Sequence, residues 1–132
     1  MNYVNASLEA KERGIRVIET RDASIRDYAG SLHLQAKGSL GEHSVIGALL
    51  GDGEIRITSV DDFPINVPPS KHMLFTLHRD MPGIIGKIGS LLGSFNVNIA
   101  SMQVGRKIVR GDAVMVLNLD DPLPDGILSE ID

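Results

Sequence analysis

The stretch that decides the fold is "TLHRDMPGIIGKIGSLLGSFNVNIASMQVGR", residues 76–106. It reads as a strand, a sharp turn, a helix, a second turn and a second strand. Between Pro82 and Phe95 the apolar residues fall at helical spacing, which predicts a helix with Pro82 at its first position, where a missing N–H costs nothing. The turn before this helix carries polar side chains, so it is the first place to look for a site.

Three glycines inside the predicted helix, Gly86, Gly89 and Gly93, recur at intervals of three and four and therefore share one helix face. A nucleotide-binding loop places its glycines before a helix, in a pattern such as GxGxxG, and this sequence has no such pattern. We therefore expect the glycine face to pack closely against another subunit or against the preceding part of the chain.

The helix belongs to a unit that begins near residue 71. Further strands are predicted over 72–79 and 112–120, and Pro124 and Asp125 mark the first turn of a second helix. The resulting order, β-α-β-β-α, is one strand short of the ferredoxin-like βαββαβ plait. We therefore expect a C-terminally truncated sheet of that type.

The residues up to about Ser70 are predicted to form a separate, strand-rich antiparallel unit, which makes the fold class α+β with units 1–70 and 71–132. A short helix ends at Gly14, and 21–30 is a polar loop. Alternating or β-branched patterns predict strands over 15–20, 31–38, 43–50 and 54–60. The proline-rich stretch 63–70 is predicted to be an edge strand or a linker.

Two of these strands carry predictions of burial. The strand over 31–38 is expected to be half-buried, and the strand over 54–60 is expected to turn its apolar residues inward. The inward residues would be Leu32, Leu34 and Ala36 in the first case and Ile55, Ile57 and Val60 in the second.

Composition excludes several classes of protein. The 132 residues carry a net charge of −4 and only 4% aromatics, which argues against binding of nucleic acid by charge or by base stacking. The absence of cysteine excludes disulfides and thiolate chemistry and suits the cytoplasm. No apolar run approaches the length of about 20 residues that crosses a bilayer. The histidines have no metal-ligand spacing, and no nucleophile motif is present, so we expect no metal and no catalytic residue.

The residues of the opening stretch resemble the start of an ACT domain, the small amino-acid-sensing module. The matching marks are the H-x-D-x-P-G turn, the glycine-rich helix, "NVNIASM" and the later strand "AVMVLNLD". With "VNASLEAKERGI" and "SVIGALLGDGEIRI" upstream, nearly the whole chain resembles the regulatory region of long-form bacterial D-3-phosphoglycerate dehydrogenase. In that region the second half of an intervening, allosteric-substrate-binding domain precedes the ACT domain. The regulatory region of iron–sulfur L-serine dehydratase is an alternative.

The resemblance implies a regulatory fragment in serine biosynthesis that binds L-serine and forms at least a homodimer through side-by-side ACT domains. The parent's NAD and catalytic residues would lie in a catalytic domain that this sequence does not include. No cofactor is expected in the chain itself. A ligand-free dimerisation module is the alternative from another class.

The resemblance also implies a set of ligand residues: His78, Asp80, Gly83 and Asn98. Asp80 would accept the ammonium of an amino acid, free N–H groups at the helix start would hold its carboxylate, and the imidazole and amide would complete the site. From the residues alone, the favoured interpretation is that Asp80 is a helix cap and His78 an exposed strand-end residue, and the resemblance reverses this preference.

A second implied site is an anion site at the domain junction, formed by Arg56 on the strand over 54–60 and by Lys71. The family's second basic residue would fall near "VPPS", where this chain has prolines, and Lys71 is the nearest cation. The alternative is that Arg56 is a solvated charge on a strand, which is the commonest environment of an arginine.

Overall fold

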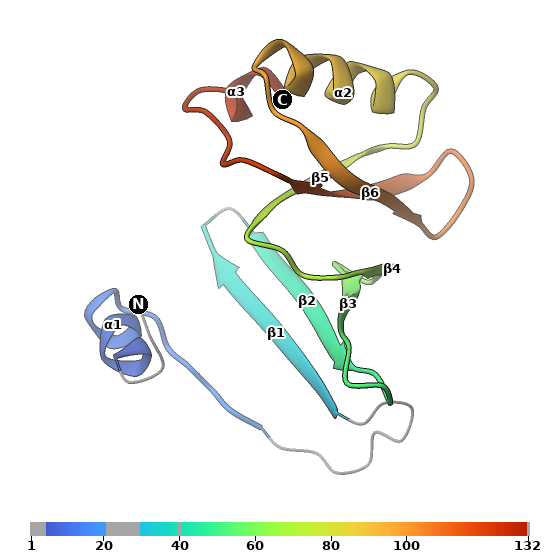
Figure 1. The fold of residues 1–132 in the computed structure, drawn as a ribbon. Coiled ribbons are helices and arrows are strands. Elements are labelled where there is room, and N and C mark those ends of the chain that lie inside the picture. Colours follow the sequence, from blue (N-terminus) through green and yellow to red (C-terminus); the bar gives the residue numbers. More distant parts are fainter. Residues whose placement is uncertain (1–4, 21–29, 40, 132) are drawn as a thin grey trace.

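The computed structural model describes residues 5–20, 30–39 and 41–131, and it has the predicted α+β architecture. Its helices are α1 (Ala6–Glu12), α2 (Ile84–Ser94) and α3 (Leu128–Ile131). Its strands are β1 (Gly30–Gly38), β2 (Gly41–Leu49), β3 (Ile55–Val60), β4 (Phe63–Val67), β5 (His72–Arg79), β6 (Ile99–Arg106) and β7 (Asp112–Leu119). They form two antiparallel sheets, β1-β2-β3-β4 and β5-β7-β6 (Figure 1). The second unit thus has the predicted order β-α-β-β-α.

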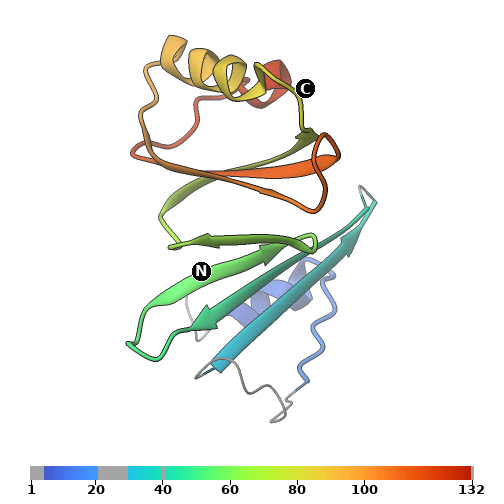
Figure 2. The same cartoon turned by 90° about the vertical axis from the view of Figure 1, so that its right-hand side faces the viewer.

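The second sheet lies between the first sheet and the helices α2 and α3 (Figures 1 and 2). On its helix side, Leu74, Met115 and Leu117 form a core with Ile88 and Leu92 of α2. On its other side, a smaller core joins the two sheets; its buried members are Val60, Ile65, Val67, Val114 and Val116. The near-continuous apolar sequence of β7 follows from this position, because the strand is covered on both faces.

The edge strand β4 makes the closest contact between the sheets, and the stretch 63–67 confirms the edge strand predicted there. The side-chain amide oxygen of Gln103 accepts a hydrogen bond of 2.6 Å from the backbone N–H of Asn66. A Cβ at Gly105 would clash with the carbonyl oxygen of Pro64 and lie 2.7 Å from Cγ2 of Ile65. The glycine therefore lets two backbones approach each other.

The start of α2 differs from the prediction. The helix begins at Ile84 and not at Pro82, because Gly83 takes a left-handed conformation, with φ of 94°, at the N-cap position. Pro82 therefore lies in the turn before the cap. At α3 the prediction is also wrong, because residues 125–127 form a turn and the helix starts only at Leu128.

The glycine face of α2 does not pack against the preceding part of the chain, which lies on the opposite side of the second sheet. A Cβ added at Gly86, Gly89 or Gly93 would meet no atom within 4 Å among the described residues. Packing of this face against another subunit stays a prediction.

Strand β1 forms where predicted but is not half-buried. Leu32 and Leu34 lie on its inner face, opposite Gly47 and Val45, yet their side chains are 61% and 58% exposed. The second sheet covers the first mainly at β4, three strands away, so neither Leu32 nor Leu34 joins a core formed by the described residues. The exposure of β1 is thus a matter of position in the sheet and not of sequence pattern.

Strand β3 confirms two of three inward residues. Ile57 and Val60 pack into the core between the sheets, and an irregularity in the β3–β4 register between Ile57 and Ser59 lets both face it. Ile55 is 61% exposed, because it pairs with Leu49 beyond the end of β4.

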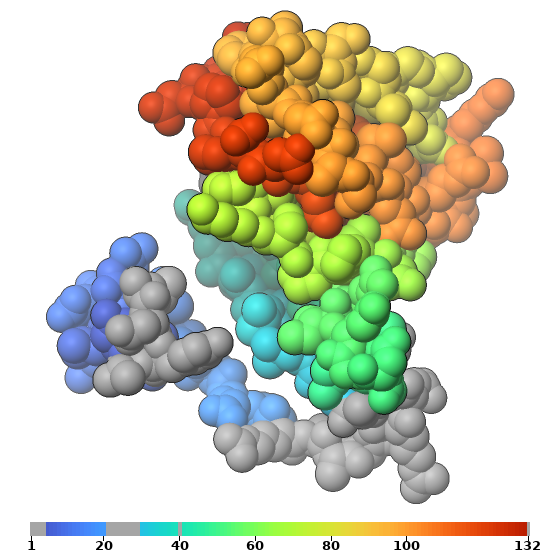
Figure 3. Space-filling view, in the orientation of Figure 1, coloured from blue at the N-terminus to red at the C-terminus, as the bar shows by residue number. Residues whose placement is uncertain are grey.

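The N-terminal segment confirms a helix and contradicts a strand. Helix α1 ends at a left-handed Gly14, where the N–H of Ile15 donates to the carbonyl of Ala10 over 2.8 Å. Residues 15–20 form no strand and are exposed, because β-branched residues make a strand only beside a pairing partner. Residues 14–16 and 18 of this segment line an open pocket opposite the end of β1, and helix α1 lies to one side of the first sheet in Figure 3. The loop predicted over 21–30 lies outside the described residues, except for Gly30, which begins β1.

Candidate functional site

The turn between β5 and α2 is hydrogen-bonded to the turn between β6 and β7. Register pairs the end of β5 and the end of β6 with the start of β7, so the two turns meet at one end of the sheet. The backbone N–H of Asp80 donates to the carbonyl of Gly111 over 2.8 Å. Arg110, the residue before Gly111, has a positive φ of 61°. Its backbone N–H donates a hydrogen bond to the carboxylate of Asp80.

The carboxylate of Asp80 does not cap α2. Its Oδ2 accepts a hydrogen bond of 2.7 Å from Nη1 of Arg106 and one of 3.2 Å from the backbone N–H of Arg110. These hydrogen bonds, with that from Arg106 the stronger cause, hold the pKa of Asp80 below its usual range. The side chain is 24% exposed. Asp80 is thus a partly exposed carboxylate whose charged form is favoured by a neighbouring cation.

His78 lies two residues before Asp80, on β5, and its charge also contributes to the lowered pKa of that carboxyl. Its Nδ1 lies 3.5 Å from Oγ1 of Thr76. His78 is partly buried and is one of the residues that line an open cleft of about 720 Å³ between the two units. Gly83, the fourth predicted ligand residue, opens the helix start with no side chain in the way.

Asn98 lies at the other end of the sheet. His78 is paired with Ala113, and Ile99, just after Asn98, is paired with Leu119. Six residues of β7 separate these positions, which is roughly 20 Å. One chain therefore brings His78, Asp80 and Gly83 together but not Asn98.

The amide of Asn98 is engaged locally at its own end of the sheet. Its Nδ2 donates to Oδ2 of Asp120 over 2.5 Å, and the backbone carbonyl of Asn98 accepts from the backbone N–H of Asp120 over 3.2 Å. Asn98 is exposed and immediately precedes β6, which is an edge strand of the second sheet. It is therefore positioned to face a neighbouring molecule.

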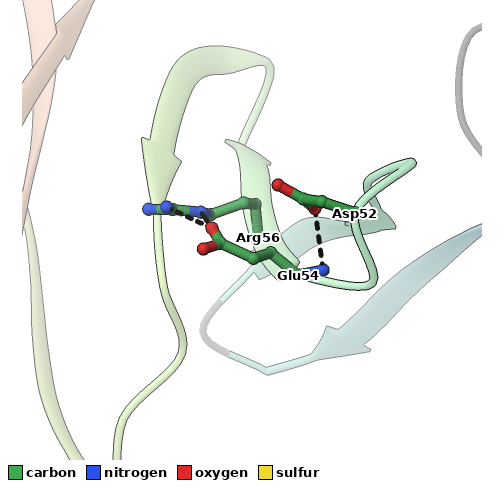
Figure 4. Close-up of polar contacts among 3 residues, drawn as sticks. All are labelled: Asp52, Glu54 and Arg56. Carbon is green, nitrogen blue, oxygen red and sulfur yellow. Dashed lines mark hydrogen bonds and ion pairs between the residues drawn. The ribbon is translucent and has the colours of Figure 1, made fainter.

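Arg56 does not form a basic cluster with Lys71. Its guanidinium donates from Nη2 to Oε2 of Glu54 over 2.5 Å, and the N–H of Glu54 donates to Asp52 over 3.0 Å (Figure 4). Lys71 is exposed and makes no hydrogen bond or ion pair with Arg56 among the described residues. The charge of Arg56 is therefore balanced within its own hairpin.

The cleft between the units contains a histidine–aspartate pair that the sequence reading missed. Nδ1 of His43 lies 2.8 Å from Oδ2 of Asp61, and the N–H of Ser44 donates to Oδ1 over 2.7 Å. Burial raises the pKa of Asp61, but the hydrogen bonds from His43 and Ser44 outweigh it, so the pKa is lowered overall. Asp61 has a φ of 46°, and the Asp-Asp step between two strands was the only signal of this turn.

Within residues 5–20, 30–39 and 41–131, no three histidine, aspartate or glutamate side chains are grouped to hold a metal ion. In the same part of the chain, no helix has the length and apolar character needed to cross a membrane.

Comparison with known proteins identifies both units. Residues 1–61 match the family model of the D-3-phosphoglycerate dehydrogenase intervening domain, and residues 72–132 match that of the ACT domain. The chain thus carries these two domains in that order, and the second contains the candidate site.

Individual relatives agree. A D-3-phosphoglycerate dehydrogenase of Synechocystis sp. is 82% identical over 99% of this chain and 24% of the relative. One from Bacillus subtilis is 36% identical over 99% of the chain and 25% of the relative. A probable L-serine dehydratase beta chain from Bacillus subtilis is 25% identical over 92% of the chain and 56% of that protein. The chain spans about a quarter of the length of the dehydrogenases that it matches.

Proposed function

We propose that this chain, an intervening domain followed by an ACT domain, is the regulatory region of a D-3-phosphoglycerate dehydrogenase and binds L-serine. Identity of 82% to a dehydrogenase, against 25% to a dehydratase chain, favours the first parent over the second. The boundary between the units would lie near Ser70. The NAD site and the chemistry would lie in the parent's catalytic part, in the cytoplasm.

The observation that carries the proposal is the half-site at the end of β5. Asp80 is held ionised, His78 lies two residues before it, and Gly83 leaves the helix start open. A carboxylate beside an imidazole suits the ammonium and hydroxyl of a small polar amino acid. Asn98 would complete the site from a second copy.

The edge strand β6 supplies a way to bring in that second copy. If two β6 strands pair antiparallel about their middle, at Met102 and Gln103, Ile99 of one copy faces Arg106 of the other. Asn98 of the second copy then lies beside the turn that holds Asp80. A two-fold dimer would therefore contain two equal sites, each with residues of both chains.

The mechanism would be linkage. L-Serine that contacts both chains binds the paired arrangement better than the separated one, and it shifts the population toward pairing. The parent would sense this shift through the first domain. The proposal leaves out an anionic effector at Arg56 and Lys71, because the guanidinium of Arg56 is already paired with Glu54.

Subunit complementation tests the shared site. Asp80→Ala and Asn98→Ala chains should each lose L-serine binding in calorimetric titration. Random exchange between the two variants makes about half of the dimers mixed, and a mixed dimer holds one complete site out of two. About a quarter of the wild-type sites should therefore return.

Three results would contradict the proposal. The first is no heat with L-serine for the wild-type dimer, and the second is unchanged binding in both variants. The first result supports a ligand-free dimerisation module, and the second would place the bound L-serine at other residues. The third is loss of binding in both variants with no recovery on mixing, which would place both residues in one chain's site.

A further inference from the structure

The ion pair between Asp80 and Arg106 leaves hydrogen-bonding atoms of both side chains without a partner among the described residues. Oδ2 of Asp80 takes both hydrogen bonds, and Oδ1 accepts none within the described part of the chain. Toward the described residues Arg106 donates from Nη1 only, although a guanidinium has five N–H donors, and its side chain is 50% exposed. The carboxylate of Asp80 and the guanidinium of Arg106 therefore lie side by side. The first has an oxygen and the second has N–H groups that can still form hydrogen bonds with a ligand.

This arrangement matches the charge pattern of a zwitterion. An ammonium placed at Oδ1 of Asp80 brings the carboxylate of the same amino acid next to the free N–H groups of Arg106. A guanidinium binds a carboxylate by two parallel hydrogen bonds, which the N–H groups at a helix start cannot match in charge. Arg106 ends the edge strand β6, so it also lies where a second copy would meet the site.

Two of the neighbouring cations have partners other than Asp80. Nη1 of Arg79 lies 3.4 Å from the carboxylate of Asp112. Lys107 lies over the ring of Phe63, 5.1 Å from its centroid, and 3.9 Å from the carboxylate of Asp62. Among the cations at this end of the sheet, Arg106 is the one whose side chain is directed to Asp80.

We propose that Arg106 is the specificity-determining residue of the amino-acid site and binds the α-carboxylate of the ligand while Asp80 holds the ammonium. This inference rests on the proposed function. It assigns the carboxylate to a side chain at the end of β6 and not to the backbone of α2. It also makes the site selective for free amino acids over amides and amines.

The test is a cycle of two ligands and four proteins, measured by calorimetry at one salt concentration. The ligands are L-serine and L-serinamide, which lacks the carboxylate charge. The proteins are wild type, Arg106→Gln, Arg106→Lys and Arg79→Gln. Arg79→Gln is the matched control, because it removes the same charge from an exposed ion pair at the same end of the sheet.

Wild type should bind L-serine about 10- to 100-fold more tightly than L-serinamide, which is the usual contribution of a charge-assisted bond. In Arg106→Gln this ratio should fall to near one. Arg106→Lys should restore part of it, and Arg79→Gln should keep the wild-type ratio. Because each ratio compares two ligands on one protein, a general loosening of the turn does not alter it.

The outcomes separate the two proposals. Binding of L-serine by wild type, with an undiminished ratio in Arg106→Gln, overturns the role of Arg106 and leaves the serine site standing. An equal fall of the ratio in Arg79→Gln overturns it too, because the effect is then one of net charge. A wild-type dimer that binds neither ligand overturns the serine site and the role of Arg106 together.

Discussion

The two sheets of this molecule are both antiparallel, and their strands lie in very different environments. In the second sheet, every residue of β7 from Ala113 to Leu119 is buried. In the first sheet, every residue of β1 is exposed, although Leu32, Leu34 and Ala36 alternate with polar residues as in a half-buried strand. The alternation of apolar and polar residues along a strand shows which side chains share a face. Whether that face is buried depends on a second layer of structure packing against it.

The two sheets are consequently held by different means. The second sheet is clamped between α2 and the first sheet, so packing dominates its stability. The first sheet is packed mainly near β4, and toward β1 it relies on strand pairing and on polar contacts such as His43 with Asp61. Substitutions of the same chemistry should therefore have very different effects in the two regions.

The largest contrast is expected for leucine truncation. Leu117→Ala in β7 removes a fully buried side chain and should lower the free energy of unfolding by about 2–5 kcal/mol. Leu34→Ala in β1 removes an exposed one and should change it by no more than about 0.5 kcal/mol. Urea denaturation measures both. A large loss in Leu34→Ala would show that the inner face of β1 is covered in solution.

A smaller effect is expected where the sheets touch. In Gly105→Ala the new methyl meets the Pro64 carbonyl and the Ile65 side chain, so the free energy of unfolding should fall by about 1–3 kcal/mol. Gly86→Ala is the control, because its methyl enters open space on a helix and should raise stability by about 0.5–1 kcal/mol. Loss of dimer in Gly86→Ala, seen by sedimentation, would instead place the glycine face in a subunit contact.

The smallest effect concerns the polar turn of the first sheet. The folded-state pKa of Asp61 is lowered, so its ionisation stabilises the fold above the unfolded value of about 3.9 and loses that effect as pH falls through the folded value. Asp61→Asn should therefore cost about 1 kcal/mol at pH 7, with the difference from wild type shrinking below about pH 4. Thermal melts from pH 3 to 7 measure this. Asp62→Asn, at an exposed neighbouring side chain, is the control and should show no such pH dependence.

The second unit was predictable because its signals are strong and local. Helical spacing from Ile84 to Phe95 and the apolar run of β7 each belong to one element. The start of α2 was misplaced by two residues because proline at a first helical position is only a tendency. Here Gly83, in a conformation that other residues adopt with strain, set the boundary.

The site was predictable in its residue types and not in its contacts. The H-x-D-x-P-G turn pointed to His78 and Asp80, and the tertiary fold revealed that Arg106 holds Asp80. These residues lie 26 positions apart, and no local pattern links a turn after one strand to the end of another. The predicted strand included Asn98, but β6 begins one residue later, at Ile99, and the register of β7 puts Asn98 at the far end of the sheet.

The sequence by itself determined the α+β class and the order of the elements in the second unit, because these follow from the spacing of apolar and polar residues. It also named candidate residues for an amino-acid site from their side-chain chemistry. Only the tertiary structure decided that β1 is exposed, that residues 15–20 form no strand and that Asp80 is paired with Arg106. Burial and ion pairing depend on which distant segments meet, and that outcome is a property of the whole fold.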